Sequence, residues 1–310
     1  MVTGASGLLG ANLVFEWSRQ DLDVVAMANI HTVSIPGVKA LRCDLLDAKH
    51  TQEIVRSMNP GWIIHCAAAT NVEWCERNVD ECFRINAAAS GLLARTARSV
   101  GARFVYISTD SVFSGERGGH TESDTATPLN VYARSKLAGE QAVGQELPTS
   151  LIVRTNIYGW NMQPKESLAE WMLGRLQRHS TFSGFADVIF APLLVNDLAD
   201  CLREMMTSDL EGLFHVAGGE ACSKYEFGCR LARVFELDST LVQRSSIRDS
   251  KLLAPRPLNT SLNTSKIAEA LGRSMPAVEA GLERFKTLSE NGFAAGLKEA
   301  GKRGLQECPR

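Results

Sequence analysis

The sequence has almost no excess of charge of either sign and no long hydrophobic run. Its 33 lysine and arginine residues nearly balance its 35 aspartate and glutamate residues, which leaves a formal net charge of -2. This balance excludes the broad basic surface that nucleic acids or anionic membranes require. No apolar stretch reaches the roughly 18 residues that a membrane span needs, and Met1 leads into a glycine motif instead of a signal peptide. We therefore expect a cytoplasmic protein that binds small molecules or other proteins, but no nucleic acid and no membrane.

The cysteines form no recognisable metal-binding or disulfide pattern. The eight residues are scattered, with no Cys-x-x-Cys motif and no histidine pair at zinc-ligand spacing, so no metal site is predicted. Free thiols of this kind suit a reducing cytosol. Internal repeats and low-complexity linkers are also missing. With 310 residues, 45% of them hydrophobic, the chain can form one nucleotide-binding unit with a smaller appended lobe.

The chain opens with a glycine-rich turn, Gly4-x-x-Gly7-x-x-Gly10, followed by helical periodicity over 11–17. Glycines permit a tight turn and a close approach of a ligand, while the amides and dipole of a helix N-terminus favour an anion. The turn is therefore predicted to bind the diphosphate of a dinucleotide, although a lone motif of this kind can also be an ordinary loop. Only two residues precede Thr3, a shorter first strand than the usual about five, which suggests that N-terminal residues are missing. The predicted contacts are Gly4, Ser6, Gly7, Leu8, Leu9 and Gly10.

A second strand is predicted over 23–28, and its end places Asn29 at the adenosine ribose. An aspartate or glutamate at this place would bind the 2'-hydroxyl and repel a 2'-phosphate. Because no acid is present, the sequence leans slightly to NADPH over NADH and allows both. A further strand over 41–45 brings Asp44 and Leu45 to the adenine, although a solvent-exposed turn aspartate is an equal interpretation of Asp44.

An apolar run over 61–66 indicates a buried parallel strand, in which His65 is interpreted as a core residue. Small residues follow it, which leaves room for a cofactor across the end of the strand. One long amphipathic helix is predicted over 80–100, and then a strand over 103–109. That strand brings Thr109 to the carboxyl edge of the sheet, where open α/β folds bind ligands. The small residues are Ala67, Ala68 and Ala69.

Tyr132 and Lys136 are four residues apart in a run rich in helix formers, so both side chains should share one helix face. An ammonium next to a phenol stabilises the phenolate and lowers the tyrosine pKa from about 10 toward neutrality, as a general acid requires. The spacing alone also occurs by chance on helix surfaces. Combined with the glycine turn and the strand ending at Thr109, it predicts a proton-transfer site in which Tyr132 and Lys136 also contact the cofactor.

Alternating strands and helices predict an α/β fold of the Rossmann type, with a doubly wound parallel sheet and right-handed crossovers. The dinucleotide-binding core is expected over 1–155, with the strand 151–155 as its last regular element. A later segment, about 188–217, is expected to return to this core. A smaller, interleaved substrate lobe is expected over 156–187 and 218–288. Residues 289–310, rich in glycine, lysine and glutamate, are predicted to be a loose tail.

Within the substrate lobe, the spacing of Ser223 and Glu226 indicates a capping box at the start of a helix that ends at Phe235. The other segments of helical periodicity lie at 166–178, 196–207, 264–271 and 277–288, and an apolar strand is expected over 213–217.

These motifs resemble the extended short-chain dehydrogenases/reductases and, within them, the dTDP-4-dehydrorhamnose reductase family. The stretches 108–115 and 128–140 carry the closest resemblance, which extends to about Leu288. It implies that Thr109 hydrogen-bonds a substrate carbonyl, that Tyr132 protonates its oxygen, and that Lys136 lowers the tyrosine pKa while binding the nicotinamide ribose. The implied reaction is NAD(P)H-dependent reduction of a keto group on a nucleotide-linked sugar, by a protein that can form a homodimer.

The substrate side departs from the family pattern in two places. The family usually has a tyrosine where this chain has Ser111, and a tryptophan where it reads Asn156-Ile157-Tyr158-Gly159, which is similar to sugar-nucleotide epimerases. Both differences concern the identity of the sugar more than the reaction. Arg256 is the candidate for the substrate diphosphate because its guanidinium fork suits phosphate oxygens, although an arginine between two prolines can equally be a surface residue. The expected substrate contacts are Thr70, Asp110, Ser111, Asn156 and Arg256.

Three functions fit the sequence. The first is a reductase of a nucleotide-linked keto sugar. The second is an epimerase of such sugars with bound NAD; a 4,6-dehydratase is disfavoured because Ser111 replaces the acid of its Thr-Asp-Glu motif. The third is a non-catalytic binding or regulatory protein of this fold, as the regulatory subunit of methionine adenosyltransferase is in this family.

Overall fold

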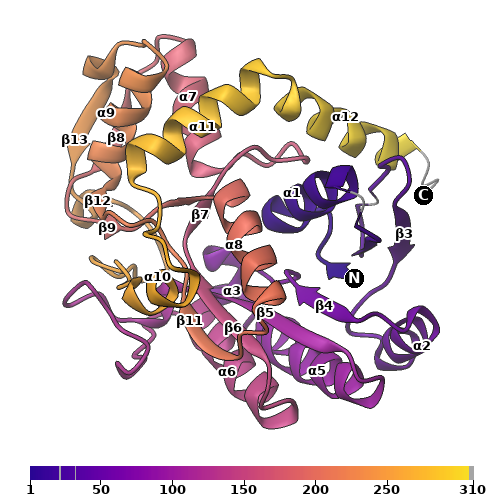
Figure 1. Cartoon of the computed structure of the whole chain (residues 1–310). Coiled ribbons are helices and arrows are strands. Elements are labelled where there is room, and N and C mark those ends of the chain that lie inside the picture. Colours follow the sequence, from indigo (N-terminus) through magenta and orange to yellow (C-terminus); the bar gives the residue numbers. More distant parts are fainter. Residues whose placement is uncertain (21, 32, 307–310) are drawn as a thin grey trace.

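A seven-stranded parallel sheet forms the centre of the molecule (Figure 1). The computed structural model describes residues 1–20, 22–31 and 33–306. The strand order is β11-β6-β5-β4-β1-β2-β3, so the order of connection reverses between β1 and β4, and the predicted doubly wound α/β fold is confirmed. The strands are β1 (Val2–Thr3), β2 (Val25–Ala28), β3 (Lys39–Arg42), β4 (Trp62–His65), β5 (Arg103–Thr109), β6 (Leu151–Thr155) and β11 (Gly212–His215).

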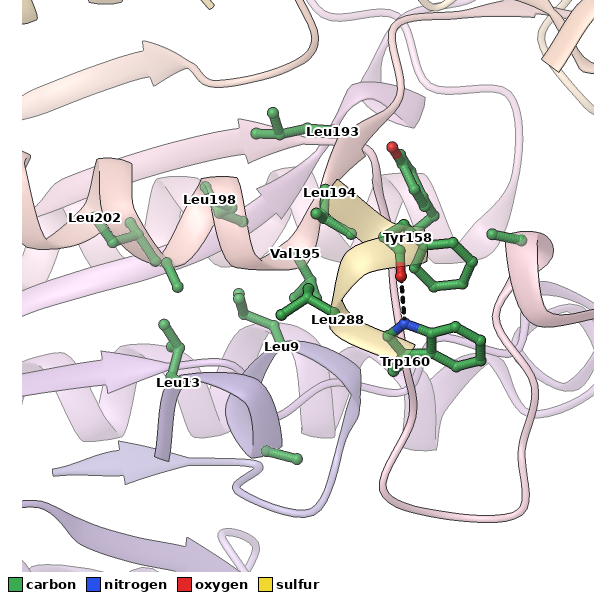
Figure 2. Close-up of a cluster of buried hydrophobic side chains, with 14 of the residues drawn as sticks. Leu9, Leu13, Tyr158, Trp160, Leu193, Leu194, Val195, Leu198, Leu202 and Leu288 are labelled. Carbon is green, nitrogen blue, oxygen red and sulfur yellow. Dashed lines mark hydrogen bonds between the residues drawn. The ribbon is translucent and has the colours of Figure 1, made fainter. Parts of the chain in front are cut away.

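Helices cover both faces of this sheet, which explains why its strands are largely apolar along their whole length. On one face α1 (Leu8–Trp17) packs against α8 (Val195–Thr207), and Figure 2 shows Leu9 and Leu13 of α1 opposite Leu198 and Leu202 of α8. On the other face α5 (Ala89–Ser99) packs against both α2 (Ala48–Met58) and α6 (Val131–Glu146). None of the helices in the described ranges is long and apolar enough to cross a membrane.

The long helix predicted over 80–100 is confirmed as one continuous helical segment over 79–99, but it contains a π-helical turn that the prediction did not include. After α3 (Val72–Arg77) and α4 (Val79–Phe83), the chain forms a π-helical turn, η2 (Arg84–Ala88), before α5 begins. The turn contains Asn86, a fully buried residue whose side chain bonds the backbone of Ala69. A π turn changes the direction of the side chains that follow it, and such turns are frequent at functional sites. The apolar periodicity of the segment contains no sign of this interruption.

A smaller lobe is built from α7 (Leu168–Gln177), α9 (Lys224–Val234) and short two-stranded sheets. Both helices begin with complete capping boxes, and the box predicted from Ser223 and Glu226 is confirmed. A capping hydroxyl satisfies an amide that has no acceptor within the helix, so it fixes where each helix starts. The sheets pair β10 (Leu193–Leu194) with β7 (Ile157–Tyr158), β12 (Cys222–Ser223) with β9 (Ile189–Phe190), and β13 (Val242–Ser245) with β8 (Phe182–Phe185).

The C-terminal segment is helical and packed, so the predicted loose tail is wrong for the described residues up to 306. After α10 (Ser265–Leu271), the chain forms α11 (Val278–Glu290), which packs against α9, and then α12 (Phe293–Gln306), which runs back across α1 (Figure 1). Phe293 meets Phe15 edge to face at 5.1 Å between ring centroids, and Leu297 one turn later is fully buried. These apolar residues at helical spacing anchor α12, while its glycines, lysines and glutamates misled the prediction. Residues 307–310 lie outside the described residues.

Four short 3-10 turns lie between the helices and strands of the described chain. They are η1 (Ser18–Gln20), η3 (Asp110–Val112), η4 (Ser239–Leu241) and η5 (Ile247–Asp249). Of these, η3 begins directly after Thr109 at the carboxyl edge of β5 and therefore lies at the candidate site.

Candidate functional site

A cavity of about 890 Å³ lies along the carboxyl ends of the sheet strands. The glycine turn forms one part of its wall, and Thr109, Tyr132 and Lys136 form another. The structure brings together all the residues predicted to bind a cofactor, and four of the five predicted substrate contacts, Arg256 being the one that is not at this wall. The cofactor group comprises Gly4, Ser6, Gly7, Leu8, Leu9, Gly10, Asn29, Asp44, Leu45, Ala67, Ala68, Ala69, Tyr132 and Lys136, and the substrate group Thr70, Asp110, Ser111 and Asn156.

The glycine turn has a geometry that only glycine permits. Gly4 has a φ of +63°, and a Cβ on it would lie 2.6 Å from the amide nitrogen of Ala67. A Cβ on Gly10 would lie 2.3 Å from the Gly4 carbonyl oxygen, so Gly10 lets α1 approach the turn closely. Gly7, in contrast, is exposed and its Cβ would meet protein only at 3.3 Å, from that same oxygen.

The turn therefore fits a dinucleotide diphosphate on structural grounds. Gly7 caps α1, and no side chain occupies the first amides of this helix. Those amides carry the positive end of the helix dipole and are the groups that a phosphate would bind. The open space above Gly7 leaves room for a close approach of the ligand, as expected of a phosphate-binding turn.

The adenosine end of the cavity is formed by loops after β2 and β3. Asn29 and His31 follow β2, are exposed, and lie at the wall. Asp44 follows β3, which ends at Arg42 and not at residue 45 as predicted. One carboxylate oxygen of Asp44 accepts from the Leu46 amide at 3.0 Å, which leaves the other oxygen available to a ligand. No carboxylate stands directly at the end of β2, in agreement with the sequence.

The three predicted catalytic residues meet where β5 ends and α6 begins. Asn130 caps α6 by accepting from the Ala133 amide at 2.9 Å, and this fixes the first turn, which contains Tyr132. Thr109 is 7% exposed, and its hydroxyl oxygen accepts from the Ser111 amide at 3.2 Å. Lys136 is 3% exposed, and its ammonium lies 4.0 Å from the ring centroid of Tyr106.

Burial controls the protonation of both members of the Tyr-x-x-x-Lys pair. Desolvation lowers the pKa of Lys136 to about 7, and the nearby Glu140 carboxylate opposes this shift. Burial raises the pKa of Tyr132 above its usual value, against a hydrogen bond with Thr109 that lowers it. Lys136 is not among the strongest influences on Tyr132. The lowering of the Tyr132 pKa by Lys136, which the resemblance implies, is thus not seen in this structure.

Sequence reasoning missed Asn86, which connects the cofactor wall with the catalytic helix. Its Oδ1 accepts from the Ala69 amide at 2.8 Å, and its Nδ2 donates to the Ala69 carbonyl at 3.0 Å and to the Ser135 hydroxyl at 2.9 Å. Its own carbonyl accepts from the hydroxyl of Tyr106, the ring on which Lys136 rests. The helical stretch around Asn86 also contains Arg84, Ser90 and Thr96, so nothing in the sequence singled out Asn86. Asn86 positions groups on both sides of the cavity.

Glu140 was also missed as a member of the site. It lies one turn after Lys136 and accepts two bonds from Arg154, at 2.9 and 2.6 Å, in addition to one from Ser108 at 2.5 Å. A buried carboxylate needs such partners to remain charged. Its negative charge favours the protonated form of Lys136, whose pKa burial would otherwise lower further. The spacing of Lys136 and Glu140 was the signal in the sequence.

The predicted substrate contacts next to Thr109 are bonded mainly to one another. Asp110 is 1% exposed, burial raises its pKa, and it accepts bonds from Asn156 at 2.7 Å and from Thr260 at 2.5 Å. The Ser111 hydroxyl donates to the same carboxylate at 3.2 Å. Thr70 is exposed and accepts from Lys165 at 3.3 Å.

Arg256 lies apart from this group and is bonded to Glu73 at 2.9 Å. The contact of Arg256 with a substrate diphosphate stays a prediction.

Comparisons with known proteins agree with this geometry. The chain is 32% identical over 284 residues to a probable low-salt glycan biosynthesis reductase of Haloferax volcanii, covering 90% of this chain and 94% of the relative. It is 34% identical over 286 residues to the methionine adenosyltransferase 2 subunit beta of Mus musculus, covering 88% and 82%. The crystal structure of dTDP-4-dehydrorhamnose reductase from Bacillus anthracis in complex with NADP superimposes with a TM-score of 0.81 at 30% identity, over 92% of this chain and 97% of that one.

The family model described as the RmlD substrate binding domain matches residues 1–290, which include the whole cavity wall. The chain therefore belongs to this family, a group of extended short-chain dehydrogenases/reductases that are similar to dTDP-4-dehydrorhamnose reductase.

Proposed function

We propose that the protein catalyses the NAD(P)H-dependent reduction of a keto group on a nucleotide-linked sugar. The observation that carries this proposal is the meeting of Thr109, Tyr132 and Lys136 at the wall of the cavity that also contains the glycine turn. A hydroxyl pair next to a buried ammonium is suited to protonate a carbonyl oxygen as hydride arrives. The family membership and the name of the Haloferax volcanii relative, a reductase, support the same reaction class.

Each part of the wall has a distinct role in this proposal. The amides of the glycine turn and of the α1 N-terminus would hold the cofactor diphosphate, and Lys136 would bind the nicotinamide ribose. The bound nicotinamide supplies the hydride. Thr109 would donate a hydrogen bond to the substrate carbonyl, and the Tyr132 hydroxyl would transfer its proton to the same oxygen. The Glu140 carboxylate opposes the lowering of the Lys136 pKa by burial, and Asn86 bonds both the cofactor wall at Ala69 and the catalytic helix at Ser135.

We expect NADPH to be preferred slightly over NADH. No acid stands at the end of β2, so nothing there repels a 2'-phosphate, and Asn29 can bind either form of the ribose. The NADP in the Bacillus anthracis structure supports this expectation.

The direct test is to mix the purified chain with NADPH and dTDP-4-keto-6-deoxyglucose and to follow the absorbance of the reduced cofactor. Stoichiometric oxidation with formation of a reduced sugar supports the reductase. A changed sugar without net oxidation would instead indicate an epimerase in which the cofactor is recycled. UDP-linked keto sugars in parallel reactions distinguish the nucleotide base.

A second function is favoured by one specific observation. The methionine adenosyltransferase 2 subunit beta of Mus musculus is as similar to this chain as the reductase of Haloferax volcanii is. A binding or regulatory role is therefore the alternative proposal. Tight NADPH binding with no conversion of any tested keto sugar, and a changed rate of a methionine adenosyltransferase on addition of this chain, would support it.

A further inference from the structure

Asp110 is a buried carboxylate whose two oxygens each accept two hydrogen bonds from the chain. It follows Thr109 directly and is 1% exposed. Its Oδ2 accepts from Nδ2 of Asn156 at 2.7 Å and from the hydroxyl of Thr260 at 2.5 Å. Its Oδ1 accepts from the hydroxyls of Thr109 and Ser111, each at 3.2 Å. A carboxylate offers about four acceptor positions, so a ligand could reach Asp110 only by displacing one of these donors.

The four hydrogen bonds of Asp110 differ in length. The two bonds to Oδ2 have the lengths of bonds to a charged oxygen, which are about 2.5–2.9 Å. The two bonds to Oδ1 are longer than the about 2.5–3.0 Å that is usual between two oxygens. Burial raises the pKa of Asp110, and the bond from Thr260 opposes this shift most, followed by the bond from Asn156. The carboxylate is therefore stabilised mainly at Oδ2, and the Thr109 hydroxyl is held only weakly.

Backbone hydrogen bonds fix the position of Thr260 on both sides. Thr260 lies in the segment between η5 and α10, and its amide donates to the carbonyl of Ile189 in β9 at 3.0 Å. The carbonyl of the next residue, Ser261, accepts at 3.0 Å from the amide of His120, in the loop between η3 and α6. Thr260 is 6% exposed. Its hydroxyl is thus kept at Asp110 by two different parts of the chain and is shielded from water.

The hydrogen of the Thr109 hydroxyl can serve only one acceptor at a time. It can bond Asp110 or a substrate carbonyl, but not both. The oxygen of the same hydroxyl accepts from the Ser111 amide at 3.2 Å, so only the hydrogen needs to change partner. Because the bond to Asp110 is long, little is lost when the hydrogen turns to a substrate. Without Thr260, Oδ2 of Asp110 would lose its shortest bond, and the carboxylate would hold the Thr109 hydroxyl more strongly.

We propose that Thr260 is a positioning residue, which donates to Asp110 and thereby leaves the Thr109 hydroxyl free to bond the substrate carbonyl. This inference rests on the proposed function, in which Thr109 donates to that carbonyl. Thr260 acts through Asp110 and has no contact of its own with the reacting atoms in this proposal. Thr260 and Asp110 are 150 positions apart in the chain, so the spacing of the catalytic motifs gives no sign of their contact.

The test compares wild type with Thr260→Val, which replaces the hydroxyl with a methyl group of similar size. With NADPH and dTDP-4-keto-6-deoxyglucose, kcat should fall about 10-fold, because the bond from Thr109 strengthens as charge develops on the carbonyl oxygen. The substrate KM and the dissociation constant of NADP+ should stay within about twofold. Thr260→Ser keeps the hydroxyl and should retain most of the rate. Thr96→Val is the matched control, since it removes a buried hydroxyl that donates to the Leu92 carbonyl in α5, and it should leave kcat unchanged.

A double-mutant cycle separates positioning from packing. If Thr260 acts through Thr109, adding Thr260→Val to Thr109→Val should lower kcat by less than about twofold. A further loss of about 10-fold in that background overturns the inference, because Thr260 would then act independently of Thr109. A Thr260→Val chain with a kcat within about twofold of wild type overturns it as well.

A signal that needs no turnover separates this inference from the proposed function. The Ser111 amide donates to the Thr109 hydroxyl oxygen, so its nitrogen–proton NMR signal reports on that hydroxyl. The signal should shift in Thr260→Val and keep its place in Thr96→Val. If wild type reduces no keto sugar, the proposed reaction is contradicted; a shifted Ser111 signal then still supports the control of Thr109 by Thr260, and an unshifted one overturns it. If Thr260→Val no longer binds NADP+ and is therefore misfolded, Thr260→Ala, which only shortens the side chain, replaces it in each measurement.

Discussion

The two sides of the catalytic residues use their polar groups differently. On the cofactor side, the glycine turn and the start of α1 leave backbone amides open to a cavity of about 890 Å³. On the substrate side, Asp110, Asn156 and Thr260 are bonded to one another, and Arg256 is bonded to Glu73. The cofactor side is therefore preformed for a ligand. On the substrate side the polar side chains already hydrogen-bond one another, so a substrate must replace some of these hydrogen bonds with its own. The affinity for the cofactor should therefore depend mainly on the shape of the glycine turn. The affinity for the substrate should depend on the hydrogen bonds within the protein that the substrate displaces.

The largest effect is expected where the two sides meet, at Tyr132. Tyr132→Phe should lower the single-turnover rate of NADPH oxidation by about 10²- to 10⁴-fold, because it removes the proton donor but leaves the packing of the ring. The dissociation constant of NADPH should stay nearly unchanged. Tyr158→Phe is the control, since it also removes a buried hydroxyl, one that has no partner among the described residues. A Tyr132→Phe rate within a few fold of wild type would show that another group delivers the proton.

The preformed cofactor side should not tolerate a side chain in the glycine turn. Gly10→Ala places a Cβ 2.3 Å from the Gly4 carbonyl oxygen, so the turn must shift, at a cost of about 2–3 kcal/mol in the free energy of unfolding. NADP+ affinity should fall with it. Gly144→Ala, in the last turn of α6 where a Cβ would meet nothing within 4 Å, is the control and should raise stability by up to about 0.5–1 kcal/mol. Urea denaturation of the two variants measures both changes in the free energy of unfolding. If Gly10→Ala changes it no more unfavourably than Gly144→Ala does, the turn can accommodate a side chain and the prediction is wrong.

The same contrast separates what the sequence could predict from what it could not. The glycine turn and the Tyr132, Lys136 pair are local patterns, whose chemistry follows from spacing along the chain. His65 could also be interpreted correctly as a core residue, since it is bonded to the hydroxyls of Thr3 and Ser90. The contact between Glu73 and Arg256 joins residues that are 183 positions apart, and no local pattern encodes it.

The missed elements have a physical explanation as well. Asn86 looked like any other polar residue of a helix because a π turn, which periodicity does not reveal, directs it to Ala69. The C-terminal helix was missed because glycines and charged residues outnumber its anchors, Phe293 and Leu297. Tertiary burial, which a single sequence does not show, decided both cases.

The buried ammonium of Lys136 on the cofactor side should make the free energy of unfolding depend on pH. Lys136 has a pKa lowered to about 7 in the folded chain, against a usual value of 10.5, so between these values the unfolded chain binds more protons. The free energy of unfolding should therefore rise with pH above about 7, by about 1 kcal/mol per unit. Below pH 7 both states are protonated and the contribution is constant. Denaturation of wild type and Lys136→Met from pH 6 to 9 measures the difference, and parallel curves would contradict the assigned shift.

The smallest effect concerns the adenosine end, where the cofactor side is least specific. Asn29→Asp adds a carboxylate directly after β2, which should bind a 2'-hydroxyl and repel a 2'-phosphate. The ratio of the NADP+ to the NAD+ dissociation constant should rise about tenfold, a change of about 1.4 kcal/mol. Asn59→Asp, the same change at an exposed position after α2, is the control and should leave the ratio unaltered. An unchanged ratio in Asn29→Asp would mean that another group at the wall, such as His31 or Asp44, distinguishes the 2'-hydroxyl from the 2'-phosphate. Even the preformed cofactor side would then select its ligand by contacts beyond the end of β2.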